Sequence, residues 1–555
     1  MKTSKVYHSL LAMFFLCLTA WFTTGCEDHL YNGIESADPA TQQDDWVALL
    51  EEINAESSII VEKESSIQDA VDAANPGDAI YIEPGTYPES VTITKSNIQL
   101  IGLKGESGEQ VSISGLKGMD KVGVEIRNIQ HPELMTKGPN NNHKRSDKKR
   151  RLISMDRREL KNGIAHYRFV VDLGKDEFDV VRIHRVVREH RSYRPVRTDG
   201  AVFMIHGSSQ NFDDIFLRPG VDKPDEQSSS PLYLASNNID VWGIDLAWTL
   251  VPLETSDFSF MKDWGVERDV DHTLKAMAIA RLVRGLSGQG FDQLNLLGFS
   301  YGVAVAYAAA GRETQQHGIR RDIKGVIAAE GAMKYAVEDE DSRIANCNRA
   351  AGAQAQLDMG IYQNSNGLTF SLFGDDAVLS PHDPSPVPGF TNYQFVLFLG
   401  TSTFAQGDPP APFWHFVGGE FDGTSPIPQG LLYTKPSRWI QLLRGLPPYQ
   451  PQLGGKELSA CLCNEEEVTI DDHLSEIKLP ILYLGVAGGF GQQGLFTSSL
   501  TRSSDVTDYI VTLQPGELRA IDFGHGDLFM AEEASELAWE VLRRWLVEHA
   551  QKFRA

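Results

Sequence analysis

The sequence predicts an α/β protein built on a doubly wound, mostly parallel β-sheet with a large cap insertion, preceded by a short β-rich module. From His166 onward, apolar β-type runs alternate with helical segments, a pattern that indicates a parallel sheet flanked by helices. A glycine-bounded turn at residues 298–302 lies between a β-type run and an Ala-rich helix. Residues 331–477 are too many for a simple connection, so we expect them to form a cap or lid.

The composition of the 555-residue chain excludes several classes of protein. With 51 Lys and Arg against 75 Asp and Glu, the formal net charge is −24, which argues against a nucleic-acid partner. A hydrophobic fraction of 41% is ordinary for a globular chain and excludes wholesale disorder. An apolar run near membrane-spanning length occurs only at the N-terminus, so a polytopic membrane protein is excluded.

Residues 1–25 have the pattern of a secretory signal. Lys2 and Lys5 precede an apolar run from Leu10 to Phe22, which is short for a membrane span. Thr23-Thr24-Gly25-Cys26 follows, and small residues before a cysteine resemble the lipobox of bacterial lipoproteins. The resemblance implies that Cys26 is lipidated and anchors the protein in the bacterial cell envelope. Ordinary cleavage, giving a secreted or periplasmic protein, and a retained membrane anchor are the alternatives.

Residues 59–130 predict a short β-rich module. An N-capped helix begins at Ser66 and stops at Asn75-Pro76-Gly77. Short β-type runs follow at residues 79–82, 90–93, 98–101, 111–113 and 122–126. The stretch resembles the first coils of a right-handed parallel β-helix of the pectate-lyase-like kind. Two or three coils are near the minimum for a solenoid, so we expect a docking or vestigial module, with a carbohydrate-binding surface or a lyase site as alternatives.

Two polar segments flank this module. Residues 27–58 are acidic and polar and are predicted to form a flexible tether. Residues 131–152 are strongly basic and are predicted to form a solvated linker, although such a patch could instead contact anionic lipid or acidic glycan. The main domain is then expected to span residues 153–555.

The elements of the main domain are expected in a definite order. A hairpin is predicted for residues 167–173 and 180–187. Strands are predicted at residues 201–205, 240–245, 294–297, 325–329 and 480–484, and a short strand at residues 518–522. Helices are predicted near residues 266–284, 303–311 and 531–548.

Ser300 is the candidate nucleophile. Gly-x-Ser-x-Gly is common by chance, but between a strand and a helix its glycines allow a strained turn that projects the serine at the carboxyl edge of the sheet. The turn resembles the nucleophile elbow of the α/β-hydrolase superfamily, and the resemblance covers about residues 165–550. It implies oxyanion donors on the amide of Tyr301 and on Gly207 or Ser208. A serine in a structural turn is the alternative.

His525 is the candidate general base. It lies on a glycine-flanked loop before the C-terminal helix, where the resemblance places the base of the superfamily. A loop-stabilising histidine is the alternative. We expect Asp527 to cap or clamp this loop, His206 to hold the backbone of the oxyanion loop, and Asp245 to be structural.

The acid that orients His525 is ambiguous. Many members of the superfamily carry it after the strand that precedes the base strand, but residues 485–491 contain no carboxylate. Glu330 ends an earlier buried run and is the preferred candidate, because a buried carboxylate needs a partner such as an imidazole N–H. The alternatives are Asp505 and, in the cap, Glu420 or Asp422.

Cysteines indicate the compartment but no metal. Cys347, Cys461 and Cys463 remain after the signal and Cys26, and they permit one disulfide, from Cys347 to either of the other two, or three free thiols. Cys-Leu-Cys without partnering histidines predicts no zinc site. We therefore expect neither a metal nor a cofactor.

Together these patterns predict an exported serine hydrolase that cleaves a small-molecule or lipid carboxylic ester through an acyl-enzyme. The aromatic run Phe413–Phe416 in the cap favours an apolar substrate. A catalytically silent carbohydrate-binding protein remains open, as does an amidase, thioesterase or peptidase on the same fold. The sequence gives no indication of the oligomeric state.

Overall fold

The structure is a computed structural model. The chain forms two compact units, and the boundary between them lies between Leu152 and Ile153. It describes residues 58–61, 65–73, 79–82, 85–92, 99–104, 111–117, 129–130, 151–174, 178–217, 229–403, 414–423, 425–465 and 468–550. The predicted signal with Cys26, nearly all of the tether, residues 131–150 of the linker, the predicted strand at 122–126 and Phe413 lie outside the described residues. These predictions stay predictions.

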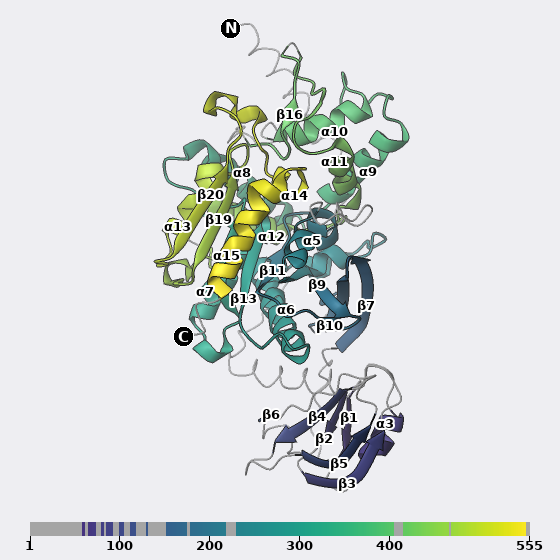
Figure 1. The fold of residues 1–555 in the computed structure, drawn as a ribbon. Helices are drawn as coiled ribbons and strands as arrows, with labels where there is room; N and C mark the ends of the chain where they lie inside the picture. The colour runs from purple at the N-terminus through teal and green to yellow at the C-terminus, as the bar shows by residue number, and fades with distance from the viewer. Residues whose placement is uncertain are drawn as a thin grey trace. The chain divides into compact units, whose positions relative to one another are not determined.

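The N-terminal unit contains two groups of parallel strands (Figure 1). One sheet consists of β1 (Ser58–Val61), β2 (Ala79–Ile82), β4 (Gln99–Lys104) and β6 (Ile129–Gln130), and β3 (Gly85–Thr92) pairs with β5 (Val111–Lys117). Helix α3 (Ile67–Ala73) begins where the Glu89 carboxylate accepts hydrogen bonds from the Ile67 and Gln68 amides. Parallel pairing agrees with the predicted strands, and the β-helix remains a prediction.

The main unit is built on a ten-stranded sheet in the order β20-β19-β14-β13-β11-β12-β9-β8-β7, with β10 (Arg194–Pro195) paired to β9. Its other strands are β7 (Arg151–Lys161), β8 (Ile164–Asp172), β9 (Val180–Arg191), β11 (Gly200–Ile205), β12 (Ile239–Asp245), β13 (Leu294–Phe299), β14 (Ile323–Ala329), β19 (Ile481–Val486) and β20 (Val506–Val511). The six strands from β20 to β12 are parallel to their neighbours, whereas β9 is antiparallel to β12 and β8. This mostly parallel sheet with flanking helices is the predicted α/β-hydrolase fold.

The central strands are nearly continuous apolar runs in the sequence because they are buried. Every residue of β11, β12, β13 and β19 is buried, as expected for parallel strands covered by helices on both faces. The helices outside the cap include α5 (Ser230–Ser236), α6 (Val266–Leu286), α7 (Tyr301–Thr314) and α15 (Glu540–Ala550) (Figure 1). Among the described residues, no helix combines the length and the apolarity that crossing a membrane requires.

The predicted cap is the insertion between β14 and β19. Its helices are α8 (Glu340–Asp358), α9 (Asn366–Leu379), α10 (Asn392–Thr401), α11 (Pro436–Gly445) and α12 (Gln452–Cys463). Two short antiparallel pairs join β15 (Gln363–Asn364) to β18 (Gln450–Pro451), and β16 (Gly419–Glu420) to β17 (Gly430–Leu431).

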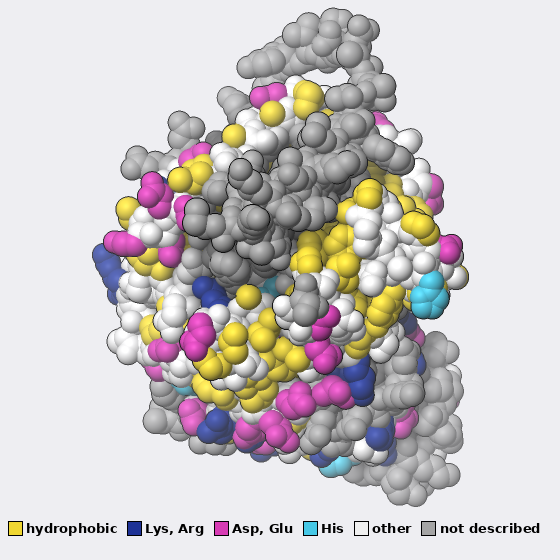
Figure 2. Space-filling model, turned by 90° about the horizontal axis from the view of Figure 1, so that it is seen from above, with side chains coloured by type: hydrophobic (Ala, Val, Ile, Leu, Met, Phe, Trp, Pro, Cys, Tyr) yellow, Lys and Arg dark blue, Asp and Glu magenta, His cyan; other side chains and the backbone are white. Residues whose placement is uncertain are grey.

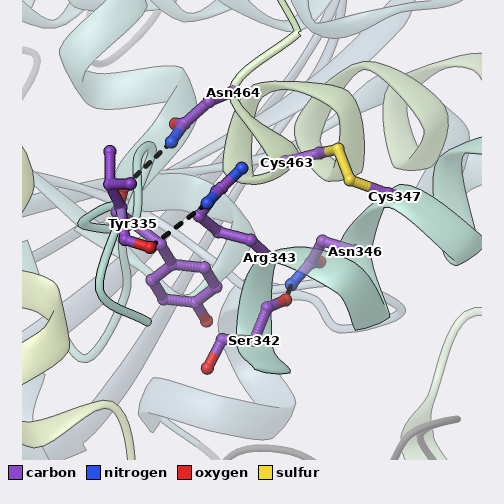
Figure 3. The surroundings of a disulfide bond; sticks show 8 residues. Tyr335, Ser342, Arg343, Asn346, Cys347, Cys463 and Asn464 are labelled. Atoms are coloured by element: carbon purple, nitrogen blue, oxygen red, sulfur yellow. Dashed lines mark hydrogen bonds between the residues drawn. A yellow bond between two sulfur atoms is a disulfide. The ribbon is translucent and has the colours of Figure 1, made fainter. Parts of the chain in front are cut away.

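A disulfide between Cys347 and Cys463 joins α8 to α12 across 116 residues (Figure 3). The sequence left the partner of Cys347 open between Cys461 and Cys463. In the structure the partner is Cys463, and Cys461 is a buried free thiol. Beside the bridge, the Asn464 side chain donates to the Tyr335 carbonyl at 3.2 Å (Figure 3). Closing so long a loop removes conformations mainly from the unfolded chain and thereby stabilises the cap.

Two strand predictions near the end of the chain are wrong. Residues 518–522 are not a strand, because residues 516–521 form the 3₁₀ helix η10 (Gly516–Ile521). The last strand is β20, which the sequence analysis missed because this edge strand is largely exposed and lacks a continuous apolar run. Arg151 and Leu152, assigned to the linker, begin β7, and Ser58, assigned to the tether, begins β1.

Candidate active site

Ser300 lies in a sharp turn between β13 and α7. Its backbone, with φ 55° and ψ −118°, adopts a conformation that non-glycine residues rarely occupy. Close packing requires the flanking glycines, because a Cβ on Gly298 would lie 2.0 Å from the Gly302 carbonyl oxygen, and one on Gly302 would lie 2.6 Å from that of Ile205. Ser300 is half-buried and follows the carboxyl end of its strand, so the turn presents it at that edge of the sheet.

The predicted oxyanion donors lie on two segments that meet at Ser300. A Cβ on Gly207 would lie 3.0 Å from Ser300 Cβ, so the loop after β11 passes directly beside the serine. Tyr301 is the first residue of α7, where backbone N–H groups have no partner within the helix. The Gly207 amide donates to Gln210 Oε1 at 3.2 Å, whereas Ser208 is exposed. Of the two candidate amide donors in this loop, that of Gly207 is therefore already hydrogen-bonded to a side chain.

His206 holds the loop after β11 in place. Its Nε2 accepts a hydrogen bond from the Leu246 amide at 3.2 Å, and its Nδ1 lies 2.9 Å from the Gly207 carbonyl oxygen. Burial lowers the pKa of His206 from its ordinary value. The ring is therefore neutral, with Nδ1 as donor and Nε2 as acceptor, and it ties the loop to the end of β12.

Glu330 and His525, far apart in the sequence, form a buried pair. Nδ1 of His525 lies 2.9 Å from Oε2 of Glu330, and the two side chains are 2% and 0% exposed. With the proton on Nδ1 facing the carboxylate, Nε2 keeps its lone pair. Among the described residues, Ser300 Oγ is not hydrogen-bonded to His525, and such contacts often tighten only when substrate binds.

Backbone amides hold the carboxylate of Glu330 in place. Oε1 accepts from Val486 at 2.8 Å and from Gly491 at 3.4 Å, and Oε2 accepts from Phe490 at 2.9 Å. A Cβ on Gly489 would lie 2.0 Å from Glu330 Oε2. The glycine-rich segment after β19, which carries no acid of its own, therefore wraps around the carboxylate supplied by the neighbouring strand.

Aromatic rings surround His525. Phe299 stacks on the imidazole with 4.7 Å between ring centroids. Phe490 lies at 5.5 Å, and Trp414 and Phe416, from the aromatic run of the cap, lie edge-on at 5.3 and 5.4 Å. The imidazole thus sits in apolar surroundings to which the cap contributes directly.

Asp527 clamps the loop that carries His525, as predicted. Its Oδ2 accepts hydrogen bonds from the amides of Gly524 and Gly418 at 2.8 Å each, and its Oδ1 accepts one from Thr434 Oγ1 at 2.5 Å. Burial raises the pKa of Asp527 to about 7. Because Gly418 and Thr434 belong to the cap, this carboxyl group joins the cap to the base loop.

In the described part of the chain, the other candidate acids have surroundings different from those of Glu330. Asp505 precedes β20 and therefore lies at the amino ends of the parallel strands, whereas Glu330 lies at their carboxyl ends. The Asp505 carboxylate is 3.3 Å from His549 Nε2. Glu420 in β16 is exposed, and the exposed Asp422 accepts a hydrogen bond from a nearby backbone amide in its own loop.

Asp269 contacts the residue after Ser300 and was not among the residues predicted for the site. The Tyr301 hydroxyl donates to Asp269 Oδ2 at 2.7 Å, and both groups are buried. Burial raises the pKa of Asp269 to about 7 and that of Tyr301 well above its ordinary value. The contact fixes the start of α7 to α6. In sequence, Asp269 looks like any acidic residue in the first turn of a helix.

No family model matches the sequence, and no curated protein is similar to it. Among solved structures, a proposed lipase from Sulfolobus solfataricus is similar at 18% identity with a TM-score of 0.49, covering 71% of this chain and 99% of that one. A soluble variant of monoglyceride lipase from Saccharomyces cerevisiae is 12% identical with a TM-score of 0.35, covering 68% and 94%. Monoacylglycerol lipase from Paleococcus ferrophilus is 14% identical with a TM-score of 0.34, covering 64% and 97%. A shared fold leaves the reaction undetermined, because function depends on the residues of the site.

Proposed function

We propose that the protein is an exported serine hydrolase that cleaves carboxylic esters through an acyl-enzyme. The observation that carries the proposal is the buried hydrogen bond between Glu330 and His525, beside the strained turn of Ser300. An imidazole oriented by a carboxylate is the general base that an unactivated serine hydroxyl needs.

In the proposed reaction, Nε2 of His525 takes the proton of Ser300 while Oγ attacks the ester carbonyl carbon. The negative oxygen is held by the Tyr301 amide and a loop amide at Gly207 or Ser208, each contributing about 3 kcal/mol. The imidazolium, stabilised by Glu330, then protonates the departing alkoxide. A water molecule, deprotonated by the same histidine, then attacks the acyl-enzyme. The acyl–Oγ bond breaks, the imidazolium returns its proton to Ser300 Oγ, and the carboxylic acid leaves.

An apolar acyl or alkyl group fits the surroundings of the site. Trp414, Phe416 and Phe490 place hydrophobic rings around the proposed base. Figure 2 shows hydrophobic side chains gathered over wide areas of one face of the molecule. The exposed large side chains of the cap include Met359, Leu372, Val378 and Leu379. Such a surface favours small-molecule or lipid esters over polar ones.

Two experiments test the reaction. A panel of p-nitrophenyl esters of graded chain length should be hydrolysed with a preference for longer acyl chains, and a fluorophosphonate probe should label the protein. Ser300→Ala should abolish both, a loss of about 10⁶-fold in kcat, with an unchanged thermal transition. Ser499→Ala, at an exposed serine whose hydroxyl donates to Phe496, is the matched control and should keep both.

Retained turnover in Ser300→Ala would remove the nucleophile assignment. Absence of labelling in the wild-type chain would instead favour a catalytically silent carbohydrate-binding protein. Amidase, thioesterase and peptidase activities share the same machinery, so amide and thioester substrates belong in the same panel.

The proposed location is the bacterial cell envelope, through a lipid on Cys26. The disulfide between Cys347 and Cys463 supports export, because such bonds persist in oxidising compartments. Cys26→Ala should move the protein from the membrane fraction to the soluble fraction. Continued fractionation with membranes, with an intact N-terminal run by mass spectrometry, would indicate an uncleaved anchor.

A further inference from the structure

A second group of chemistry-bearing side chains lies on the antiparallel part of the sheet. His166 is on β8, His184 is on β9, and Asp213 begins helix η3 (Asp213–Leu217), which follows the oxyanion loop. His166 Nε2 lies 2.9 Å from His184 Nδ1, and Asp213 Oδ1 lies 3.9 and 3.8 Å from these two nitrogens. Strands β11 and β12 separate this cluster from β13, so it is not part of the proposed active site.

We propose that His166, His184 and Asp213 bind a divalent transition-metal ion, for which Zn²⁺ is the best match. In the plane of these three atoms, the point equidistant from them lies about 2.1 Å from each, which is the length of zinc bonds to imidazole nitrogen and carboxylate oxygen. Two imidazoles and one carboxylate are donors that zinc accepts, with a water molecule as the fourth ligand.

Asp245 orients one of the ligands. Its Oδ2 lies 3.1 Å from His184 Nε2, and an imidazole that carries its proton on Nε2, toward this carboxylate, presents the lone pair of Nδ1 to the cluster. Asp245 is itself held by Arg182 at 2.9 Å and by the Phe212 amide at 2.8 Å. A carboxylate that fixes the far nitrogen of a histidine is the usual support of a metal-binding imidazole.

A direct hydrogen bond between the two imidazoles would explain the 2.9 Å contact, but it leaves Asp213 unexplained. Its Oδ1 is buried and, among the described residues, accepts no hydrogen bond. Arg168, whose positive charge interacts with Asp213, forms its hydrogen bonds with Asp156 instead. A bound cation between the three donors satisfies this oxygen, which would otherwise be buried without a partner at a cost in free energy.

The place of the cluster suggests a structural role. Asp213 follows the segment that begins with Gly207 and includes Gln210, the acceptor of the Gly207 amide. An ion at the cluster would fasten the end of this segment to β8 and β9. Removing the ion should therefore lower the stability of the fold and loosen the oxyanion loop.

Zinc and cobalt binding to the full chain tests the proposal. After removal of metals with a chelator, the protein should bind one equivalent of Zn²⁺ with a rise of several degrees in Tm, and Co²⁺ should give the intense visible absorption of a four-coordinate site. Ser300→Ala should bind zinc equally well, which separates this proposal from the proposed function. Absence of both the zinc-dependent Tm shift and the cobalt spectrum would overturn the proposal without any variant.

Variants locate the ion. His184→Gln and Asp213→Asn should each weaken Zn²⁺ binding by about 100-fold or more, and Asp245→Asn by about 10-fold. His549→Gln is the matched control, because its imidazole also lies beside an aspartate but outside the cluster, and it should bind zinc as the wild type does. Unchanged affinity in the folded Asp213→Asn protein, or an equal loss in His549→Gln, would refute the site.

Discussion

Two of the histidine–carboxylate pairs in the described part of the chain lie at opposite ends of the parallel strands. In the first, Glu330 and His525 are almost fully buried and 2.9 Å apart. In the second, Asp505 and His549 are 3.3 Å apart, and the aspartate side chain is 36% exposed. Glu330 follows its strand, whereas Asp505 precedes one, so only the first pair lies at the edge that presents Ser300.

The comparison of the two pairs indicates that a histidine and an acid form a candidate site only where they lie at the carboxyl ends of the parallel strands. In open parallel sheets, functional groups gather at the carboxyl ends of the strands, where loops from several strands meet. At that edge, amides of the neighbouring segment fix Glu330. At the other edge, His549 stacks on Trp545 within one helix at 4.1 Å and serves packing.

The largest effect should come from removing each histidine in turn. His525→Ala should lower kcat of ester hydrolysis by about 10⁶-fold, close to Ser300→Ala, because nucleophile and base act as a unit. His549→Ala should leave kcat and KM within about twofold and cost only stability. Steady-state kinetics on the two purified variants, with thermal unfolding as a check on folding, makes the comparison. Comparable losses of kcat in the two variants would mean that the position of a pair on the sheet does not determine its role in hydrolysis.

The next effect concerns the acids. Glu330→Gln should lower kcat by about 10³–10⁴-fold, since it removes the charge that stabilises the imidazolium while nearly preserving shape. Asp505→Asn, the matched change in the other pair, should cost less than about fivefold. Because the Glu330 carboxylate also accepts three backbone amides, the rates must be normalised to the folded fraction measured by circular dichroism.

The reverse pattern would make Asp505 the acid and would require a rearrangement of the structure. If neither variant matters, a cap carboxylate becomes the candidate. Activity should then depend steeply on Glu420 and Asp422.

The smallest effect should be on the pH dependence of stability, through Asp527, a buried carboxyl group that does not contact His525. Asp527 has a pKa raised to about 7 by burial, against 3.8 for a free side chain. The native state therefore keeps a proton that the unfolded chain releases, and the free energy of unfolding falls as the pH rises from about 4 to 7, by up to about 4 kcal/mol. Asp527→Asn should remove this contribution and flatten the dependence.

Urea unfolding at several pH values between 4 and 7 measures that difference. Asp269, whose pKa is also raised to about 7, keeps its own contribution in both proteins and serves as an internal reference. Equal slopes in the wild type and Asp527→Asn would show that Asp527 is ionised when folded and acts as a charged clamp.

Local sequence determined the parts of this protein whose chemistry is contained in a short segment. The turn at Ser300 could be predicted because its glycines, the preceding apolar run and the small-residue helix are contiguous. The loop that carries His525 and Asp527 and the central buried strands could be predicted for the same reason. The edge strand β20 could not, because exposure on most of its residues removes the apolar pattern.

Tertiary structure decided the partners. Glu330 was one of several candidate acids until the fold placed it 2.9 Å from His525, 195 residues away. Cys463 was chosen over Cys461 by the register of α12 against α8. The cluster of His166, His184 and Asp213 has no spacing in sequence that indicates a metal, since it forms only when a hairpin and the segment after β11 pack together. Pairing across a fold depends on which strand ends meet, and no single stretch of sequence contains that information.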